Sequence, residues 1–124
     1  MFAVTALMRD SVTIKRESVA RVDGFAVKTW TTAARGSSLP TTAICRIQSD
    51  KPEDVVGLGA RADRRAWRIY FDSDPEIDVR DRIYFTESQG STERECIVLE
   101  PSFQFDNSSA LWRCRVQEWI ATVD

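Results

Sequence analysis

The residues of this chain that could do chemistry lack their usual partners. Histidine is absent from the 124 residues, which removes the commonest general base, the Ser/His and Cys/His nucleophile pairs and the commonest transition-metal ligand. The densest acidic cluster, Asp72, Asp74, Glu76 and Asp78, has calcium-loop spacing but neither the glycine at the bend nor the closing glutamate. We therefore expect a solvated turn there, and no catalytic residue, cofactor or metal site: the protein is not expected to be an enzyme.

Two further motifs also lack the partners that a phosphate-binding loop or a redox site requires. Gly57-Leu58-Gly59 lacks the third glycine and the Lys-Ser/Thr ending of a phosphate loop. The three cysteines, Cys45, Cys96 and Cys114, are widely spaced and form no C-x-x-C motif. Each falls on the apolar phase of an expected strand, so we expect three core side chains. Thiols of this kind fit synthesis in a reducing cytoplasm.

The four tryptophans differ in whether they fall on the apolar face of an expected strand. Trp67 and Trp112 fall on apolar strand faces and are expected in the core, whereas Trp30 and Trp119 fall out of phase. Exposed aromatic side chains can mark a protein interface or a base-stacking platform. The net charge of −2 gives no basic footprint for nucleic acid or an anionic membrane. We therefore favour a protein interface and expect no membrane partner.

The elements that position these residues are short strands. Alternation of apolar and polar residues recurs in seven runs, while no helical period is strong. The expected strands are residues 11–16, 25–31, 42–48, 67–71, 81–85, 93–99 and 111–121. Turn signals at near-regular spacing indicate one all-β domain over 1–124, a small barrel or sandwich of about six to seven antiparallel strands with at most a short helix. Residues 1–10 are a possible N-terminal arm, packed on the domain or on a neighbour.

Asp23-Gly24 suggests a hairpin between the first two strands, with a connection longer than a two-residue turn. The tetrapeptide Arg-Ile-Tyr-Phe occurs at Arg68 and again at Arg82, and indicates two consecutive strands joined by a polar bend. Their phase predicts outward-facing side chains at Tyr70 and Tyr84, which a neighbouring subunit could cover.

The segment 49–66 breaks the strand pattern. Its charges cancel, and two glycines two residues apart disfavour a helix. Because long structureless loops in compact domains are usually functional or disordered, we expect one long projecting loop here.

The order of elements resembles the head-closure, or head–tail joining, proteins of long-tailed bacteriophages. The similarity lies in the 12–16 strand, Trp30 at the end of the next, the 45–48 strand, the 67–71 and 81–85 pair around an acidic bend, and the final 114–118 strand. It implies a virion structural protein of the neck, made in the host bacterial cytoplasm, that forms a homo-oligomeric ring between portal or adaptor proteins and the tail terminator or tail tube proteins.

The resemblance further implies that the ring closes the portal channel after packaging of double-stranded DNA and offers a platform for the tail. The implied channel loop is Asp54, Val55, Val56, Gly57, Leu58, Gly59, Ala60 and Arg61, and the expected subunit interface is Trp30, Tyr70, Tyr84 and Trp119. The alternative is an OB-type barrel that binds single-stranded nucleic acid. A carboxylate hydrolase within 72–81 comes third, because no set of nucleophile, base and orienting group is visible.

Overall fold

The structure is a computed structural model that describes residues 9–51, 57, 64–86, 92–104 and 111–119. These residues form seven antiparallel strands in one sheet and a short 3-10 helix. The elements are β1 (Asp10–Val22), β2 (Phe25–Thr31), η2 (Ala33–Arg35), β3 (Thr42–Asp50), β4 (Ala66–Phe71), β5 (Asp81–Thr86), β6 (Glu93–Gln104) and β7 (Trp112–Glu118). Within the described ranges, no helix has the length and hydropathy of a membrane span. The expected all-β class and strand number are confirmed.

Six strands close into a barrel. The strand order is β2-β1-β3-β4-β7-β6-β5, and a further β1–β5 pairing joins the two ends of the six-strand part. The first part of β1 makes this closure, because Asp10–Thr13 pair with β3 while Thr13–Arg16 pair with β5. Closure leaves the barrel strands without an open sheet edge.

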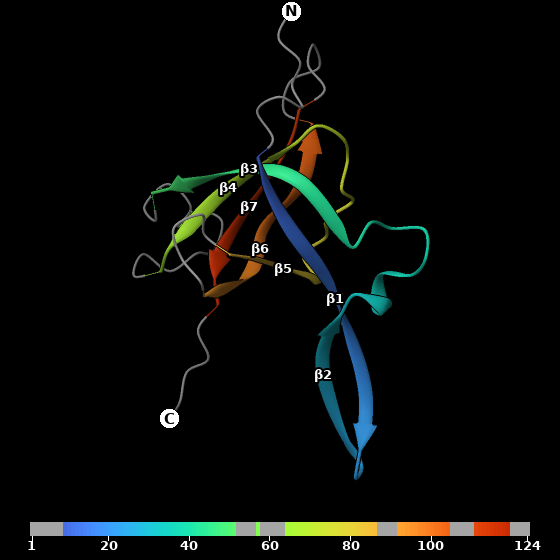
Figure 1. Ribbon diagram of the computed structural model, residues 1–124. Coiled ribbons are helices and arrows are strands. Elements are labelled where there is room, and N and C mark those ends of the chain that lie inside the picture. Colours follow the sequence, from blue (N-terminus) through green and yellow to red (C-terminus); the bar gives the residue numbers. More distant parts are fainter. Residues whose placement is uncertain (1–8, 52–56, 58–63, 87–91, 105–110, 120–124) are drawn as a thin grey trace, which may run out of the picture.

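The second half of β1 leaves the barrel and forms a projecting hairpin with β2 (Figure 1). Pairing runs from Arg16 opposite Thr31 to Val22 opposite Phe25. The turn is two residues long, not longer as the sequence suggested. Asp23 and Gly24 have φ of 52° and 84°, and two positive φ angles are what the type I′ hairpin turn requires. We call the hairpin, residues 17–30, the arm.

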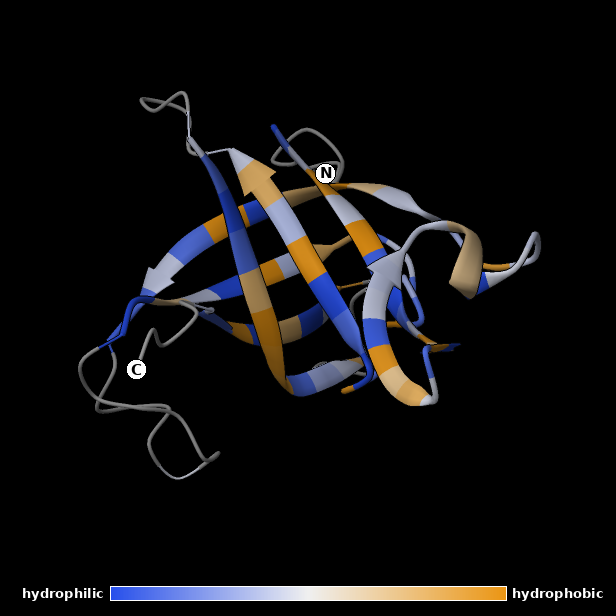
Figure 2. Ribbon diagram, turned by 90° about the horizontal axis from the view of Figure 1, so that it is seen from below, coloured by the Kyte–Doolittle hydropathy of each residue, from blue (hydrophilic) through white to orange (hydrophobic). Residues whose placement is uncertain are grey.

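The core lies inside the barrel, and buried residues alternate with less buried ones along β4 and β5. Figure 2 shows hydrophobic and hydrophilic residues interleaved along the barrel strands. This confirms the inward phases expected for the repeated strands and for all three cysteines. The buried cluster is Val12, Ile14, Cys45, Trp67, Ile69, Phe71, Ile77, Ile83, Phe85, Cys96, Val98, Cys114 and Val116. Tyr70 and Tyr84 lie on the outward phase as expected.

Several boundaries differ from the sequence expectations. β3 continues through Asp50 and β4 starts at Ala66, so the connection expected at 49–66 is shorter at both ends. β6 runs through Pro101, where the sequence predicted a connection, and its pairing with β7 shifts register on both sides of Glu100. Proline lacks the ladder N–H and is tolerated at such irregularities. A short 3-10 helix, η2, lies at Ala33–Arg35 between β2 and β3.

The bend between β4 and β5 is anchored to β6. Ile77 is buried in the core although it lies in a stretch that reads as polar. Its N–H donates to the Ser102 hydroxyl at 3.0 Å, and the Ser102 N–H donates to the Ile77 carbonyl at 3.2 Å. The Asp74 carboxylate accepts from the Glu76 N–H at 2.9 Å, so it stabilises the turn as a local acceptor.

Candidate functional site

The outer face of β5 gathers aromatic and charged side chains from four strands. Arg82 lies on the outward phase, between buried Asp81 and Ile83. Its guanidinium carbon is 3.5 Å from the ring centre of Trp30 and 4.6 Å from that of Trp119. Both distances are within cation–π range. Arg82 therefore joins the base of the arm to the end of β7.

Glu95 holds the other end of this cluster. Its carboxylate accepts from Arg82 Nη1 and from the Tyr84 hydroxyl, both at 2.7 Å. Burial acts to raise the pKa of Glu95, but these two hydrogen bonds and the positive charge of Arg82 hold it below its ordinary value. Burial, and then the hydrogen bond to Glu95, raise the pKa of Tyr84. Lys15 lies 4.2 Å from the centre of the Tyr84 ring. We call these six side chains, Lys15, Trp30, Arg82, Tyr84, Glu95 and Trp119, the aromatic cluster.

Three of the four expected interface residues thus lie together. Trp30, Tyr84 and Trp119 come from β2, β5 and the end of β7, and Trp119 is 42% exposed. Tyr70, the fourth of these residues, lies on β4 between Arg46 and Arg113. The strand order places β4 across the barrel from β5, so Tyr70 is apart from the other three. Arg82 lies over the rings of both tryptophans, so it already occupies one stacking face of each.

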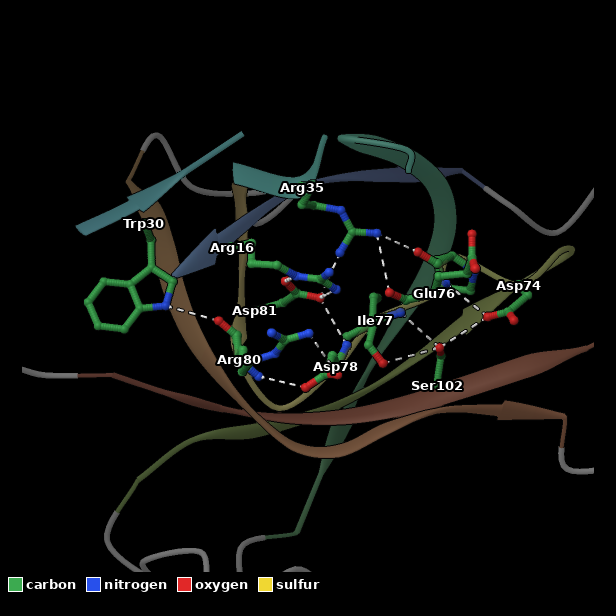
Figure 3. A network of polar contacts seen from close by, with 11 residues as sticks. Arg16, Trp30, Arg35, Asp74, Glu76, Ile77, Asp78, Arg80, Asp81 and Ser102 are labelled. Carbon is green, nitrogen blue, oxygen red and sulfur yellow. Dashed lines mark hydrogen bonds and ion pairs between the residues drawn. The ribbon is translucent and has the colours of Figure 1, made fainter. Parts of the chain in front are cut away.

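A buried carboxylate lies beneath the base of the arm (Figure 3). The Asp81 side chain is fully buried and accepts from Arg16 Nε at 2.8 Å and from Arg35 Nη1 at 2.6 Å. It also accepts from the Asp78 N–H at 2.9 Å. Arg35 Nη2 donates to the carbonyl of Pro75 at 2.7 Å. The network ties β1, η2 and the β4–β5 bend to β5, and we call it the latch.

The latch shifts the pKa of its arginines in opposite directions. The hydrogen bond to Asp81 raises the pKa of Arg16. Burial lowers the pKa of Arg35, whose guanidinium is fully buried, although Asp81 opposes the shift. Arginine stays protonated in either case, so the latch holds two positive charges on one buried carboxylate. Sequence analysis missed it; the available signal was Asp81 itself, a carboxylate on the same strand phase as Ile83 and Phe85.

Two more contacts fix the arm to the barrel. The Arg80 carbonyl accepts from the Glu17 N–H at 3.2 Å and from Trp30 Nε1 at 3.2 Å. Together with the latch and the stacking on Arg82, these contacts hold both strands of the arm where they leave the barrel.

The far part of the arm is apolar on one face and exposed. The pairs Val22–Phe25 and Ala20–Val27 place these four side chains on the same face. Phe25 is 75% exposed, Val22 53% and Val27 40%. The opposite face carries a salt bridge between Lys28 and Glu17 at 3.9 Å, with exposed Val19 beside it. We call Ala20, Val22, Phe25 and Val27 the arm face.

Metal-ligating side chains do not gather in the described residues. No group of three or more carboxylate, thiol or imidazole side chains is placed there to hold a metal ion. All three cysteines are buried, and burial raises the pKa of Cys45 to about 12. A polar depression of about 350 Å³ includes Asp10 and Glu93 in its lining. The Asp10 carboxylate accepts from the Ile47 N–H at 3.0 Å, which is a structural use.

The implied channel loop lies almost wholly outside the described residues. Of residues 54–61, the structure describes Gly57, which is exposed with open space around its Cα. Asp54, Val55, Val56, Leu58, Gly59, Ala60 and Arg61 lie outside, as do residues 1–8 of the expected N-terminal arm.

Comparison with known proteins supports the fold alone. No protein-family model and no curated protein matches the chain. Among solved structures, the chain is similar to the solution structure of protein SF1141 from Shigella flexneri 2a. The two share 16% sequence identity over 94% of this chain and 96% of that one, with a TM-score of 0.62. At this identity the likeness concerns the arrangement of strands.

Proposed function

We propose that this protein is a structural subunit of the head–tail connector of a tailed bacteriophage, in which copies of the chain form a ring that closes the portal channel and receives the tail. One observation carries the proposal: a closed barrel holds an arm firmly at its base while the arm face stays exposed to solvent. Monomeric proteins rarely expose contiguous apolar surface of this kind without a binding role.

The latch and the aromatic cluster support an assembly role over a catalytic one. Their charged groups are paired with each other, through Asp81 and through Glu95. Such contacts position one structural element on another, and paired charges of this kind are not free to act as a nucleophile or a general base. A preorganised arm loses less conformational freedom when a neighbour binds it.

Particle assembly tests the proposal. Phage heads produced without this chain should package DNA, then lose it, and should carry no tails; adding the purified chain should restore both properties. Phe25→Ser should fail to restore them. Ile44→Ser is the matched control, because Ile44 is 63% exposed and lies on β3, away from the arm. Heads that retain DNA and tails without this chain would exclude the proposal.

The channel role of residues 54–61 is part of the proposal and has its own test. Particles assembled with residues 53–62 removed should bear tails and package DNA, yet leak it. Full DNA retention by these particles would remove the channel assignment while leaving the ring intact.

An OB-type nucleic-acid-binding barrel remains the alternative, favoured by the exposed Trp119 beside Arg82. Titration of the protein with single-stranded DNA separates the two functions. The connector proposal predicts no quenching of tryptophan fluorescence. Tight binding that weakens steeply with salt, and quenching lost in Trp119→Phe, would favour the OB-type function.

A further inference from the structure

We propose that the arm face binds residues 1–8 of a second copy of this chain, so that successive copies join in one direction. The inference deepens the proposed ring by naming the two surfaces that meet, and it rests on the proposed function only in requiring that copies of the chain assemble. The occupant follows from the sequence of residues 1–8, from chain length and from the position of β2 in the sheet.

The chain carries an apolar segment that matches the arm face in chemistry. Residues 1–8 read Met-Phe-Ala-Val-Thr-Ala-Leu-Met and contain no charged side chain. In extended backbone, Phe2, Val4 and Ala6 share one side. Contact between an apolar segment and an apolar face removes both from water, which lowers the free energy of the assembled state.

The reach of the chain keeps residues 1–8 from the tip of the arm in their own copy. β1 runs from Asp10 to Val22, a length of about 40 Å at roughly 3.3 Å per residue. Leu7 lies three residues before Asp10, so it reaches about 10 Å from the start of β1, and Phe2 reaches less than about 30 Å. Residues 1–8 therefore fall short of the Val22–Phe25 pair at the tip of their own arm, and a second copy must supply the residues that cover it.

The position of β2 suits an added strand. β2 is the terminal strand of the sheet order and pairs on one side with β1. An extended segment can add to such an edge through main-chain hydrogen bonds while its side chains fill a neighbouring apolar surface. In the described residues, the first part of β1 (residues 10–16) and β5 already have barrel partners, so the open edges lie on the arm.

The contact joins different surfaces of two copies, and such heterologous contacts close into rings or continue as filaments. Arm-to-arm contact would instead give a closed dimer and leave residues 1–8 uncovered. The area that four apolar side chains can bury is also far less than the roughly 800 Å² per partner that stable two-body complexes bury. Each contact is therefore weak by itself, and closure of a ring, in which every copy uses both surfaces, strengthens it.

Engineered disulfides test the contact in the full chain. Ala20→Cys places a thiol on the arm face, and Ala6→Cys places one in the N-terminal segment. The natural cysteines are buried and do not compete. Mixing the two variants under mild oxidation should give the mixed disulfide dimer. The control is Lys28→Cys, exposed on the opposite face of the arm, mixed with Ala6→Cys.

The expected result is mixed dimer on the order of tenfold above the control, because docking raises the local thiol concentration toward the millimolar range. Adding Phe25→Ser to Ala20→Cys should return the yield to the control level. Predominant Ala20→Cys homodimer would overturn the inference in favour of arm-to-arm contact, and a yield equal to the control would overturn it outright. Since no phage particle is involved, failure here leaves the particle assay to decide the proposed function separately.

Discussion

Replacing Asp81 by alanine is the sharpest test of how the arm is held. Asp81 neutralises Arg35, whose side chain is fully buried, and Arg16, whose side chain is 16% exposed. Asp81→Ala leaves the Arg35 guanidinium buried without its counter-charge. Removing one member of a buried ion pair costs about 3–5 kcal/mol, a large part of the roughly 5–15 kcal/mol that stabilises a domain.

Urea unfolding followed by tryptophan fluorescence measures this loss. With a denaturant slope of about 2 kcal/mol per molar, a loss of about 4 kcal/mol lowers the unfolding midpoint by about 2 M. Asp78→Asn is the matched control in the same bend. The Asp78 carboxylate is 42% exposed and its ion pair with Arg80 is 3.6 Å long, so its loss should cost less than about 1 kcal/mol.

A double variant separates the buried charge from general damage to the fold. Arg35→Met removes the buried cation, so Asp81→Ala in that background no longer strands the Arg35 charge. We expect the double variant to lose less stability than the two single variants lose together, and the difference, which is the coupling energy, should be roughly 2 kcal/mol. Strict additivity, or an Asp81→Ala loss no larger than that of Asp78→Asn, would refute the assignment of the latch.

Three further predictions address the aromatic cluster and the core. Glu95→Gln should destabilise the protein at neutral pH; because the pKa of Glu95 is depressed, its contribution is present above its ordinary value of 4.5 and lost as pH falls through the folded pKa. The difference in urea midpoint between wild type and variant should therefore shrink below pH 4.5, and a constant difference would contradict the charge assignment. Trp30→Phe keeps a ring over Arg82 but removes the donor to the Arg80 carbonyl, so thermal unfolding should report a loss of about 0.5–1.5 kcal/mol, with Trp30→Ala losing more. A disulfide reagent at pH 8 should label no thiol of the native protein and all three in denaturant; rapid labelling of the native protein would show that the thiols are accessible.

Alternation was sufficient to predict which strand faces form the core. Ile69 and Phe71 point inward, as do Ile83 and Phe85, because period two follows from strand geometry itself. The outward phase of Trp30 and Trp119 was visible for the same reason. Their meeting on Arg82 was not, because it depends on the packing of β2, β5 and β7, which alternation within single strands does not encode.

The features that sequence reasoning missed depend on distant partners. Asp81 and Arg35 are 46 residues apart, so no local pattern connects them. The first strand was predicted to end at residue 16 because Glu17–Val22 does not alternate clearly: one phase mixes Glu17 and Arg21 with Val19, and the other begins with the polar Ser18. Those residues form a strand because β2 pairs with them, not because one face is buried. The sixth strand was predicted to end before Pro101 because proline has no N–H to donate to a neighbouring strand. The strand continues because the pairing of β6 with β7 is irregular on both sides of Glu100.

The base of the arm and the arm face differ in their contacts, so mutations in the two parts should affect stability and assembly differently. Its base is held by buried charge and by stacking on Arg82, whereas the arm face has no contact that the fold requires. Substitutions on the face, such as Phe25→Ser, should therefore weaken assembly at unchanged stability. Substitutions in the latch should weaken both, since a loosened arm must be ordered again when a neighbour binds. If Asp81→Ala lowered stability yet assembled as well as wild type, the latch would serve the barrel alone, and preorganisation of the arm would have no part in assembly.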